Sequence, residues 1–297
     1  MNKCQPGILY DVPKHARYLS FYLEPVSARP DKIKSALKEL AEVVDGERIV
    51  LGLGSSLLQA LGVSIPGMHL FPVMNGPAFD IPSTPAALWC WLRGEDQGEL
   101  YHLSRDIDHG LFPDFNLGHV LDGFMFKDSR DLSGYEDGTE NPQGDAAIEA
   151  AIVSGQGKGL DGSSFVAVQQ WVHDLDALQD KSVEERDDIF GRHISDNEEF
   201  EEAPESAHVK RAAQESFEPE AFILRRSMPW TEGTDAGLNF VAFGKSFDAY
   251  EAILDRMIGN EDGITDGLFS FTRPVTGAYF WCPPMKNKTL DLSALGI

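Results

Sequence analysis

The sequence predicts an α+β protein made of two ferredoxin-like (βαββαβ) halves with antiparallel sheets. Two observations support this prediction. Segments rich in β-branched and aromatic residues alternate with segments whose apolar residues recur every three or four positions, patterns typical of strands and amphipathic helices. The order strand–helix–strand–strand–helix–strand, which defines a ferredoxin-like unit, occurs twice along the 297 residues. We therefore assign residues 1–130 to an N-terminal half and residues 131–297 to a C-terminal half.

The strands of the first half are short aromatic or β-branched runs, and its helices have one apolar face. The run ARYLSFYL lies between Pro13 and Pro25, and AALWCWLR places Trp89 and Trp91 on one face of a strand. The predicted elements are a strand at 16–23, a helix at 30–44, strands at 48–53 and 86–93, a helix at 95–107 and a strand at 118–126.

Segment 51–56, LGLGSS, raises another interpretation, because two glycines at the end of a strand resemble a dinucleotide-binding loop. The third glycine of that fingerprint is missing. A helix also precedes the strand, which is the wrong order for a first βα unit. We therefore interpret the segment as a strand end and not as a nucleotide site.

The second half repeats the order of the first. The run SFVAVQQWV is a strand, and a polar helix follows it and ends before Gly191. The predicted elements are a strand at 164–172, a helix at 174–189, strands at 207–213, 221–226 and 238–243, a helix at 246–258 and a strand at 275–281.

An acidic loop at 134–142, GYEDGTENP, lies at the junction of the halves. Glycine, asparagine and proline interrupt regular structure, so neither a helix nor a central strand accepts this stretch. Ligand pockets commonly form at such junctions. The loop is therefore either a solvated turn or part of a functional site.

Composition limits the function classes. A net charge of −23 and a pI near 4.6 argue against nucleic acid or anionic membranes as partners. The three cysteines are widely spaced and form no CxxC pair, so neither a zinc site nor a disulfide framework is predicted. We find neither a secretory signal nor an apolar run long enough to span a membrane, and we expect a cytoplasmic protein.

The eight histidines include no HExxH or HxH pair, so no multi-histidine zinc site is predicted. His208 is distinctive because it opens a strand-like run, AHVKRAA, just after an acidic stretch. Downstream, ILRRSMPW ends an apolar strand with Arg225 and Arg226, which alternate between its faces. A guanidinium directed inward must meet a carboxylate or an anionic ligand.

Taken together, these segments resemble the dye-decolorizing peroxidases, haem enzymes of two ferredoxin-like halves in the dimeric α+β barrel superfamily. GYEDG matches the family's GxxDG motif, and Ile223–Pro229 is similar to its distal arginine strand. Phe190-Gly191-Arg192 resembles its haem-propionate segment, and Ser206–Val209 its proximal histidine. GITDGLFSFTRPVTG, residues 263–277, resembles its C-terminal signature. The match covers nearly the whole chain and is closest to the compact bacterial B-type members.

The resemblance implies a haem b cofactor (iron protoporphyrin IX) with His208 as the axial ligand of the iron. Asp266 would accept a hydrogen bond from the other imidazole nitrogen, which fixes the tautomer and makes the histidine a stronger donor. Arg192 would meet a haem propionate, and Gly138 would let the backbone approach the porphyrin.

On the opposite face of the haem, Asp137 and Arg225 would be the catalytic residues. Asp137 would move the peroxide proton, and Arg225 would stabilise the negative charge that develops during O–O cleavage. Ser227, on the same face of the strand as Arg225, would position a water or the peroxide. Arg226 would point away, and Glu136 and Glu140 receive no role.

The resemblance thus implies a peroxidase that oxidises dyes, phenols and other small aromatic reductants with hydrogen peroxide, and a homo-oligomer. Two alternatives remain: a haem-binding protein for storage, delivery or iron removal, and a haem-free binding module. The tryptophans are candidate relays for electrons to the surface, although most tryptophans on strands are core residues. They are Trp89, Trp91, Trp171, Trp230 and Trp281.

Overall fold

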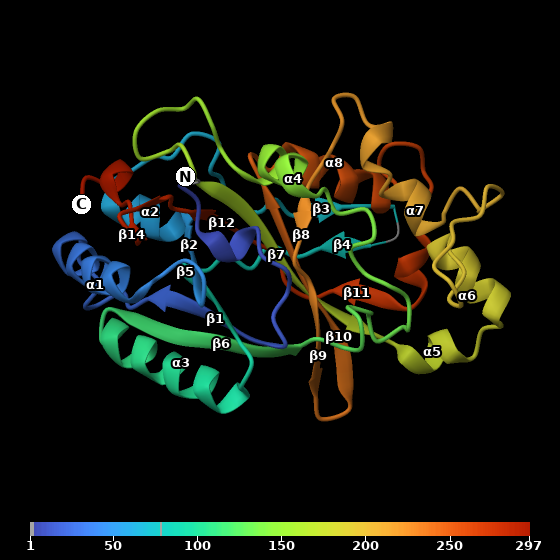
Figure 1. Ribbon diagram of the computed structural model, residues 1–297, viewed down its shortest axis with the longest axis horizontal. Coiled ribbons are helices and arrows are strands. Elements are labelled where there is room, and N and C mark those ends of the chain that lie inside the picture. The colour runs from blue at the N-terminus through green and yellow to red at the C-terminus, as the bar shows by residue number, and fades with distance from the viewer. Residues whose placement is uncertain (1–2, 78) are drawn as a thin grey trace.

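The computed structural model describes residues 3–77 and 79–297 and is built around a closed antiparallel barrel of eight strands (Figure 1). Around the barrel the order is β7-β12-β2-β5-β1-β6-β9-β10, and β10 pairs with β7 to close it. The barrel strands are β1 His15–Leu23, β2 Ile49–Gly54, β5 Leu88–Gly94, β6 Phe115–Phe124, β7 Ser164–His173, β9 Met228–Glu232, β10 Asp235–Gly244 and β12 Ala278–Cys282.

Shorter strands and helices complete the chain. Strand β11 Thr272–Pro274 extends the sheet beside β7, and β8 Leu224–Arg225 pairs with β10. Two small hairpins are β3 Met74–Asn75 with β4 Asp80–Ile81, and β13 Met285–Lys286 with β14 Thr289–Leu290. The α-helices are α1 Pro30–Val43, α2 Ser55–Leu61, α3 Gln97–Leu111, α4 Gly144–Ala151, α5 Leu175–Gln179, α6 Val183–Phe190, α7 His208–Arg211 and α8 Asp248–Met257. The 3₁₀ helices are η1 Pro6–Ile8, η2 Gln214–Ser216, η3 Gly267–Ser270 and η4 Ser293–Leu295.

The side chains of each barrel strand alternate between the barrel interior and an outer layer under the helices. In β5, Trp89 and Trp91 belong to an interior cluster to which all eight barrel strands contribute. Leu88, Cys90 and Leu92 belong to the outer cluster, which also contains the apolar face of α1. Burial on both faces explains why residues 88–92 of β5 form an uninterrupted apolar run.

The glycines of LGLGSS are explained by packing inside the sheet. A Cβ on Gly52 would lie 2.6 Å from Cβ of Phe280, and one on Gly54 would lie 1.9 Å from the carbonyl oxygen of Ala86. Neither position has room for a side chain. The segment is a strand end that leads into α2, in agreement with the interpretation above.

Two element predictions in the C-terminal part were wrong. The helix expected at 174–189 is two helices, because Ser182 and Glu185 form a capping box that starts α6 anew. The strand expected at 207–213 contains the helical turn α7, which begins at His208. Short runs of mixed apolar and polar residues fit both the helical and the strand period. In this segment the helical i→i+4 hydrogen bonds form.

Helices α6, α7 and α8 lie together at one end of the molecule, away from α1 and α3 (Figure 1). Helix α8 packs against the outer face of β10 and contacts α7, and α6 contacts α7 and η3. These elements enclose the cavity described next. Among the residues that the structure describes, no helix has the length and apolarity needed to cross a bilayer.

Candidate functional site

A cavity of about 300 Å³ lies between the outer face of β7 and β10 and the helices α6, α7 and α8. The loop that contains GYEDG forms a further wall. Most of its floor is apolar, and charged side chains gather at its rim. Its apolar lining includes Trp171, Phe190, Leu238, Phe240, Ile253, Leu254, Met257, Leu268 and Phe271.

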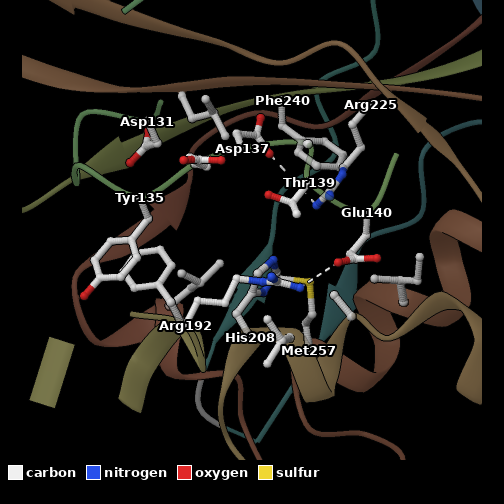
Figure 2. Close-up of a pocket in the computed structure, with 18 of the residues that line it drawn as sticks. Asp131, Tyr135, Asp137, Thr139, Glu140, Arg192, His208, Arg225, Phe240 and Met257 are labelled. Carbon is white, nitrogen blue, oxygen red and sulfur yellow. Dashed lines mark hydrogen bonds and ion pairs between the residues drawn. The ribbon is translucent and has the colours of Figure 1, made fainter. Parts of the chain in front are cut away.

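His208 lies on one side of this cavity, and Asp137 and Arg225 lie on the other (Figure 2). The Nδ1 atom of His208 is 2.8 Å from Oδ2 of Asp266, whose side chain is fully buried. The other oxygen of Asp266 accepts a hydrogen bond from the N–H of Leu268, so both oxygens of this carboxylate are held in place. Because Nδ1 donates to Asp266, Nε2 of His208 keeps its lone pair for a ligand.

Asp137 and Arg225 form the opposite wall of the cavity. Nη1 of Arg225 lies 4.0 Å from Oδ1 of Asp137, and both side chains are mostly buried. Burial raises the pKa of Asp137, while the positive charge of Arg225 opposes that rise and the negative charge of Asp131 adds to it. A carboxyl group with a raised pKa is suited to take up and return a proton.

Asn141 holds Arg225 in place, a role that no sequence pattern indicated. Its side-chain oxygen accepts the backbone N–H of Arg225 at 2.8 Å, and its amide donates to the carbonyl of Arg225 at 3.0 Å. The side-chain amide of Asn141 thus makes the two backbone hydrogen bonds that a neighbouring strand would otherwise make with Arg225 in β8. Gly138 has a φ of +82°, and a Cβ there would lie 2.9 Å from Nδ2 of Asn141. Glycine is therefore needed beside Asn141, whether or not a ligand approaches.

Arg192 lies at the rim of the cavity, and its Nη2 contacts Glu140 at 2.6 Å and Glu199 at 2.9 Å. Glu140, to which no role was given, therefore pairs with a predicted site residue. Glu136 contacts Arg130 and Asn197 instead of Arg192.

Ser227 lies outside the cavity lined by His208. Its hydroxyl accepts the N–H of Val241 at 3.3 Å, and its side chain borders a second cavity of about 380 Å³. This second cavity also borders Asp137, Gly138 and Arg225, so the loop separates the two spaces. Arg226 points away from both catalytic candidates, and its guanidinium donates to the carbonyls of Ile8 and Leu9.

All five tryptophans are buried, and Trp171 is the one that lines the cavity. Trp89, Trp91, Trp230 and Trp281 belong to the hydrophobic clusters. None of them therefore presents an indole to the surface, where a bulky reductant would meet it.

Comparison with known proteins points to one family. Residues 128–287, more than half of the chain, match the family model described as "Dyp-type peroxidase, C-terminal". The dye-decolorizing peroxidase of Mycobacterium tuberculosis is 30% identical over 243 residues, which are 79% of this chain and 72% of the relative. That of Brevibacterium linens is 29% identical over 242 residues, 79% of this chain and 66% of the relative.

Solved structures agree over almost the whole length. A putative dyp-type peroxidase protein from Shewanella oneidensis superposes with a TM-score of 0.87 at 28% identity, covering 99% of this chain and 98% of that one. A DypB variant from Rhodococcus jostii RHA1 in complex with haem has a TM-score of 0.81 at 26% identity, covering 93% and 94%. The chain belongs to the dye-decolorizing (Dyp-type) peroxidase family.

Proposed function

We propose that this protein is a haem peroxidase that uses hydrogen peroxide to oxidise dyes, phenols and other small aromatic donors. The observation that carries the proposal is the arrangement across one cavity. The imidazole of His208, oriented by a buried carboxylate, faces an Asp137–Arg225 pair. Family membership supports the reaction class, and the geometry supports the proposed roles of these residues.

The residues of the cavity fit haem b. His208 offers an unprotonated Nε2 as the axial ligand of the iron, and Asp266 fixes its tautomer. The apolar walls suit a porphyrin face, and the Arg192 guanidinium at the rim is placed to meet a propionate. Nε of Arg225 is buried and has no hydrogen-bond partner within the described part of the chain, which is consistent with a polar ligand beside it.

When bound, haem supplies the redox-active iron at which peroxide is reduced. The overall reduction takes up two electrons and two protons for each hydrogen peroxide and releases two waters. Asp137 accepts a proton from one peroxide oxygen and returns it to the other, which then leaves as water. Arg225 provides a fixed positive charge where negative charge develops. Ser227 would act from the second cavity by positioning a water or the peroxide.

The first test is the ultraviolet–visible spectrum of the holoprotein before and after one equivalent of peroxide, followed by dye oxidation. We expect a Soret band that changes with peroxide, turnover of the dye, and loss of turnover when haem is removed. A Soret band without turnover would instead support haem storage, delivery or iron removal. Absence of the band after reconstitution with haem would contradict both.

We expect the activity to favour acidic pH. As a base, Asp137 must be ionised, so the rate with peroxide falls as pH drops through its pKa. Burial raises that pKa above the usual aspartate range, so the acidic limb of the pH profile lies above that range as well. The measurement is the pH profile of kcat/KM for peroxide with an organic dye. An optimum well above neutrality would rule out Asp137 as the base.

We further propose that the barrel consists of two ferredoxin-like halves, residues 1–130 and 131–297. The strand orders β6-β1-β5-β2 and β12-β7-β10-β9 support this, because each matches the order 4-1-3-2 of that fold. Only three residue pairs join the two sets in the β12–β2 and β6–β9 ladders. The homo-oligomer and the cytoplasmic location stay predictions.

A further inference from the structure

Strand β8, which carries Arg225, lies at one end of the sheet and pairs on one side only, with β10. Arg225 is opposite Ala242, but the N–H that reaches β10 at this point belongs to Arg226 and donates to the carbonyl of Val241 at 2.7 Å. Because backbone groups alternate in direction along a strand, the N–H and C=O of Arg225 point away from β10. The proposed catalytic arginine therefore lies on a free edge of the sheet.

Two side-chain amides bind this free edge. Asn141 binds both backbone groups of Arg225. Two residues earlier, the N–H of Ile223 donates to Oε1 of Gln214 at 2.8 Å, and the N–H of Ala221 donates to the backbone carbonyl of Gln214 at 2.9 Å. Residues 221, 223 and 225 alternate along the edge, and each finds a hydrogen-bond partner there without a neighbouring strand.

Gln214 also connects the edge of β8 to the loop that carries Asp137. Its Nε2 donates to the carbonyl of Glu140 at 3.0 Å, and the residue is buried. Because Glu140 and Asn141 are consecutive, the two amides join the loop and β8 at neighbouring points. We call Asn141 and Gln214 the amide clamp.

The guanidinium of Arg225 depends on this backbone support because its own contacts are weak. Within the described part of the chain, Nε is buried and has no hydrogen-bond partner. Nη1 lies 4.0 Å from Oδ1 of Asp137 (Figure 2), which is too long for a hydrogen bond. The position of the positive charge is therefore set mainly by where the backbone of Arg225 is held.

The loop has further anchors that do not involve the amide clamp. The N–H of Asp137 donates to the carbonyl of Ser129 at 3.2 Å, and Glu136 forms an ion pair with Arg130 at 2.9 Å. Asp137 therefore keeps these contacts if the clamp is lost, whereas Arg225 loses the partners of its backbone. Loss of the clamp is expected to displace Arg225 relative to Asp137.

We propose that Asn141 and Gln214 are positioning residues for the peroxidase reaction. By binding the free edge of β8, they hold the Arg225 guanidinium where it stabilises the negative charge that develops on peroxide. Both act through Arg225 and not on peroxide itself. This inference rests on the proposed function, since it depends on the role proposed for Arg225.

The test measures kcat/KM for hydrogen peroxide in the Asn141→Ala and Gln214→Ala holoenzymes. Asn141→Ala removes both hydrogen bonds to Arg225, and we expect a loss of about tenfold to a hundredfold, the scale of a displacement of about 1 Å at a reacting centre. Gln214→Ala acts two residues away, and we expect a smaller loss of about threefold to tenfold. An unchanged kcat/KM in either variant would overturn the role of that residue.

A double-mutant cycle separates positioning from a general loss of structure. In the Arg225→Ala background no guanidinium is left to position, so adding Asn141→Ala should change kcat/KM by less than about twofold. The added substitution should still lower the melting temperature, because the backbone hydrogen bonds are lost in both backgrounds. An equal fold loss of activity in both backgrounds would show that Asn141 does not act through Arg225.

A matched control for stability is Ser182→Ala, which removes the side-chain cap at the start of α6. The hydroxyl of Ser182 accepts the N–H of Glu185 at 3.2 Å, and Ser182 lines neither cavity. We expect a lower melting temperature and an unchanged kcat/KM for peroxide. If Ser182→Ala lowered kcat/KM as far as Asn141→Ala, instability alone would explain both results.

Hydrogen exchange gives a readout that does not depend on turnover. In the full chain, the peptide that contains residues 221–226 should exchange slowly, because the amide clamp binds the N–H groups of Ile223 and Arg225. Exchange should accelerate in Asn141→Ala. Fast exchange in the unsubstituted protein would refute the clamp even if peroxidase activity is present. Failure of the proposed function would appear instead as no dye oxidation by the unsubstituted holoprotein, with slow exchange of this peptide intact.

Discussion

Replacing His208 with alanine is expected to abolish stable haem binding and, with it, peroxidase turnover. The substitution removes the Nε2 ligand and leaves Asp266 buried with Oδ2 unpaired, which adds a cost of about 1–3 kcal/mol for an unsatisfied buried group. We expect haem retention to fall by at least about a hundredfold, since a direct ligand matters at least as much as its hydrogen-bond partner. The measurement is a haem titration followed through the Soret band.

The matched control is His102→Ala, because His102 is an exposed histidine on α3, far from the cavity lining. It should bind haem as the unsubstituted protein does. A His208→Ala protein that kept the same Soret position and affinity would show that another residue ligates the iron. Added imidazole offers a further check, since it can occupy the vacated space and restore part of the spectrum.

Replacing Asp137 with asparagine is expected to lower kcat/KM for hydrogen peroxide by about a hundredfold to ten-thousandfold, because the proton transfer loses its base. Arg225→Ala should cost about a hundredfold to a thousandfold through the loss of a preorganised positive charge. Both variants should retain haem, since His208 and Asp266 are untouched. Stopped-flow mixing with peroxide measures the effect directly.

Stability distinguishes a catalytic defect from unfolding in the Asp137→Asn variant. An aspartate whose pKa is raised in the folded state contributes stability below its unfolded pKa and loses that contribution as pH rises. At neutral pH the ionised form is therefore disfavoured by folding, and the neutral amide should melt no lower than the original. Glu136→Gln, in the same loop, should change kcat/KM by less than about threefold, because the Glu136 carboxylate binds Arg130 and Asn197 and has no role in the proton transfer. Full activity in both Asp137→Asn and Arg225→Ala would exclude Asp137 and Arg225 as the catalytic residues.

Much of the fold could be predicted because its signals are local. The strand β1 and the helix α1 were expected within one or two residues of their observed limits, since period and proline boundaries lie in the residues themselves. The segment around His208 could not be assigned in the same way. Four residues of α7 are too few to establish a helical period, so the neighbouring elements decide their conformation.

The site residues also fall into two groups, those that sequence motifs indicate and those whose position depends on tertiary contacts. Sequence motifs pointed to His208, Asp137 and Arg225 as candidates. The structure brings these three residues to one cavity. Ser227 was expected beside them, yet its hydroxyl binds the Val241 backbone and borders the second cavity. The alternation of side chains along a strand predicted the face on which Ser227 lies. Its hydrogen-bond partner, however, is set by the neighbouring strand β10.

By itself, the sequence predicted most of the elements and their order, and it supplied the candidate residues for ligating iron and moving a proton. Only the tertiary structure decided that the strands close into a barrel, that Asn141 holds Arg225, and that Gln214 connects β8 to the loop of Asp137. The reason is physical. Period and propensity act between neighbours along the chain, whereas burial, charge and hydrogen-bond partners are set by residues that folding brings together.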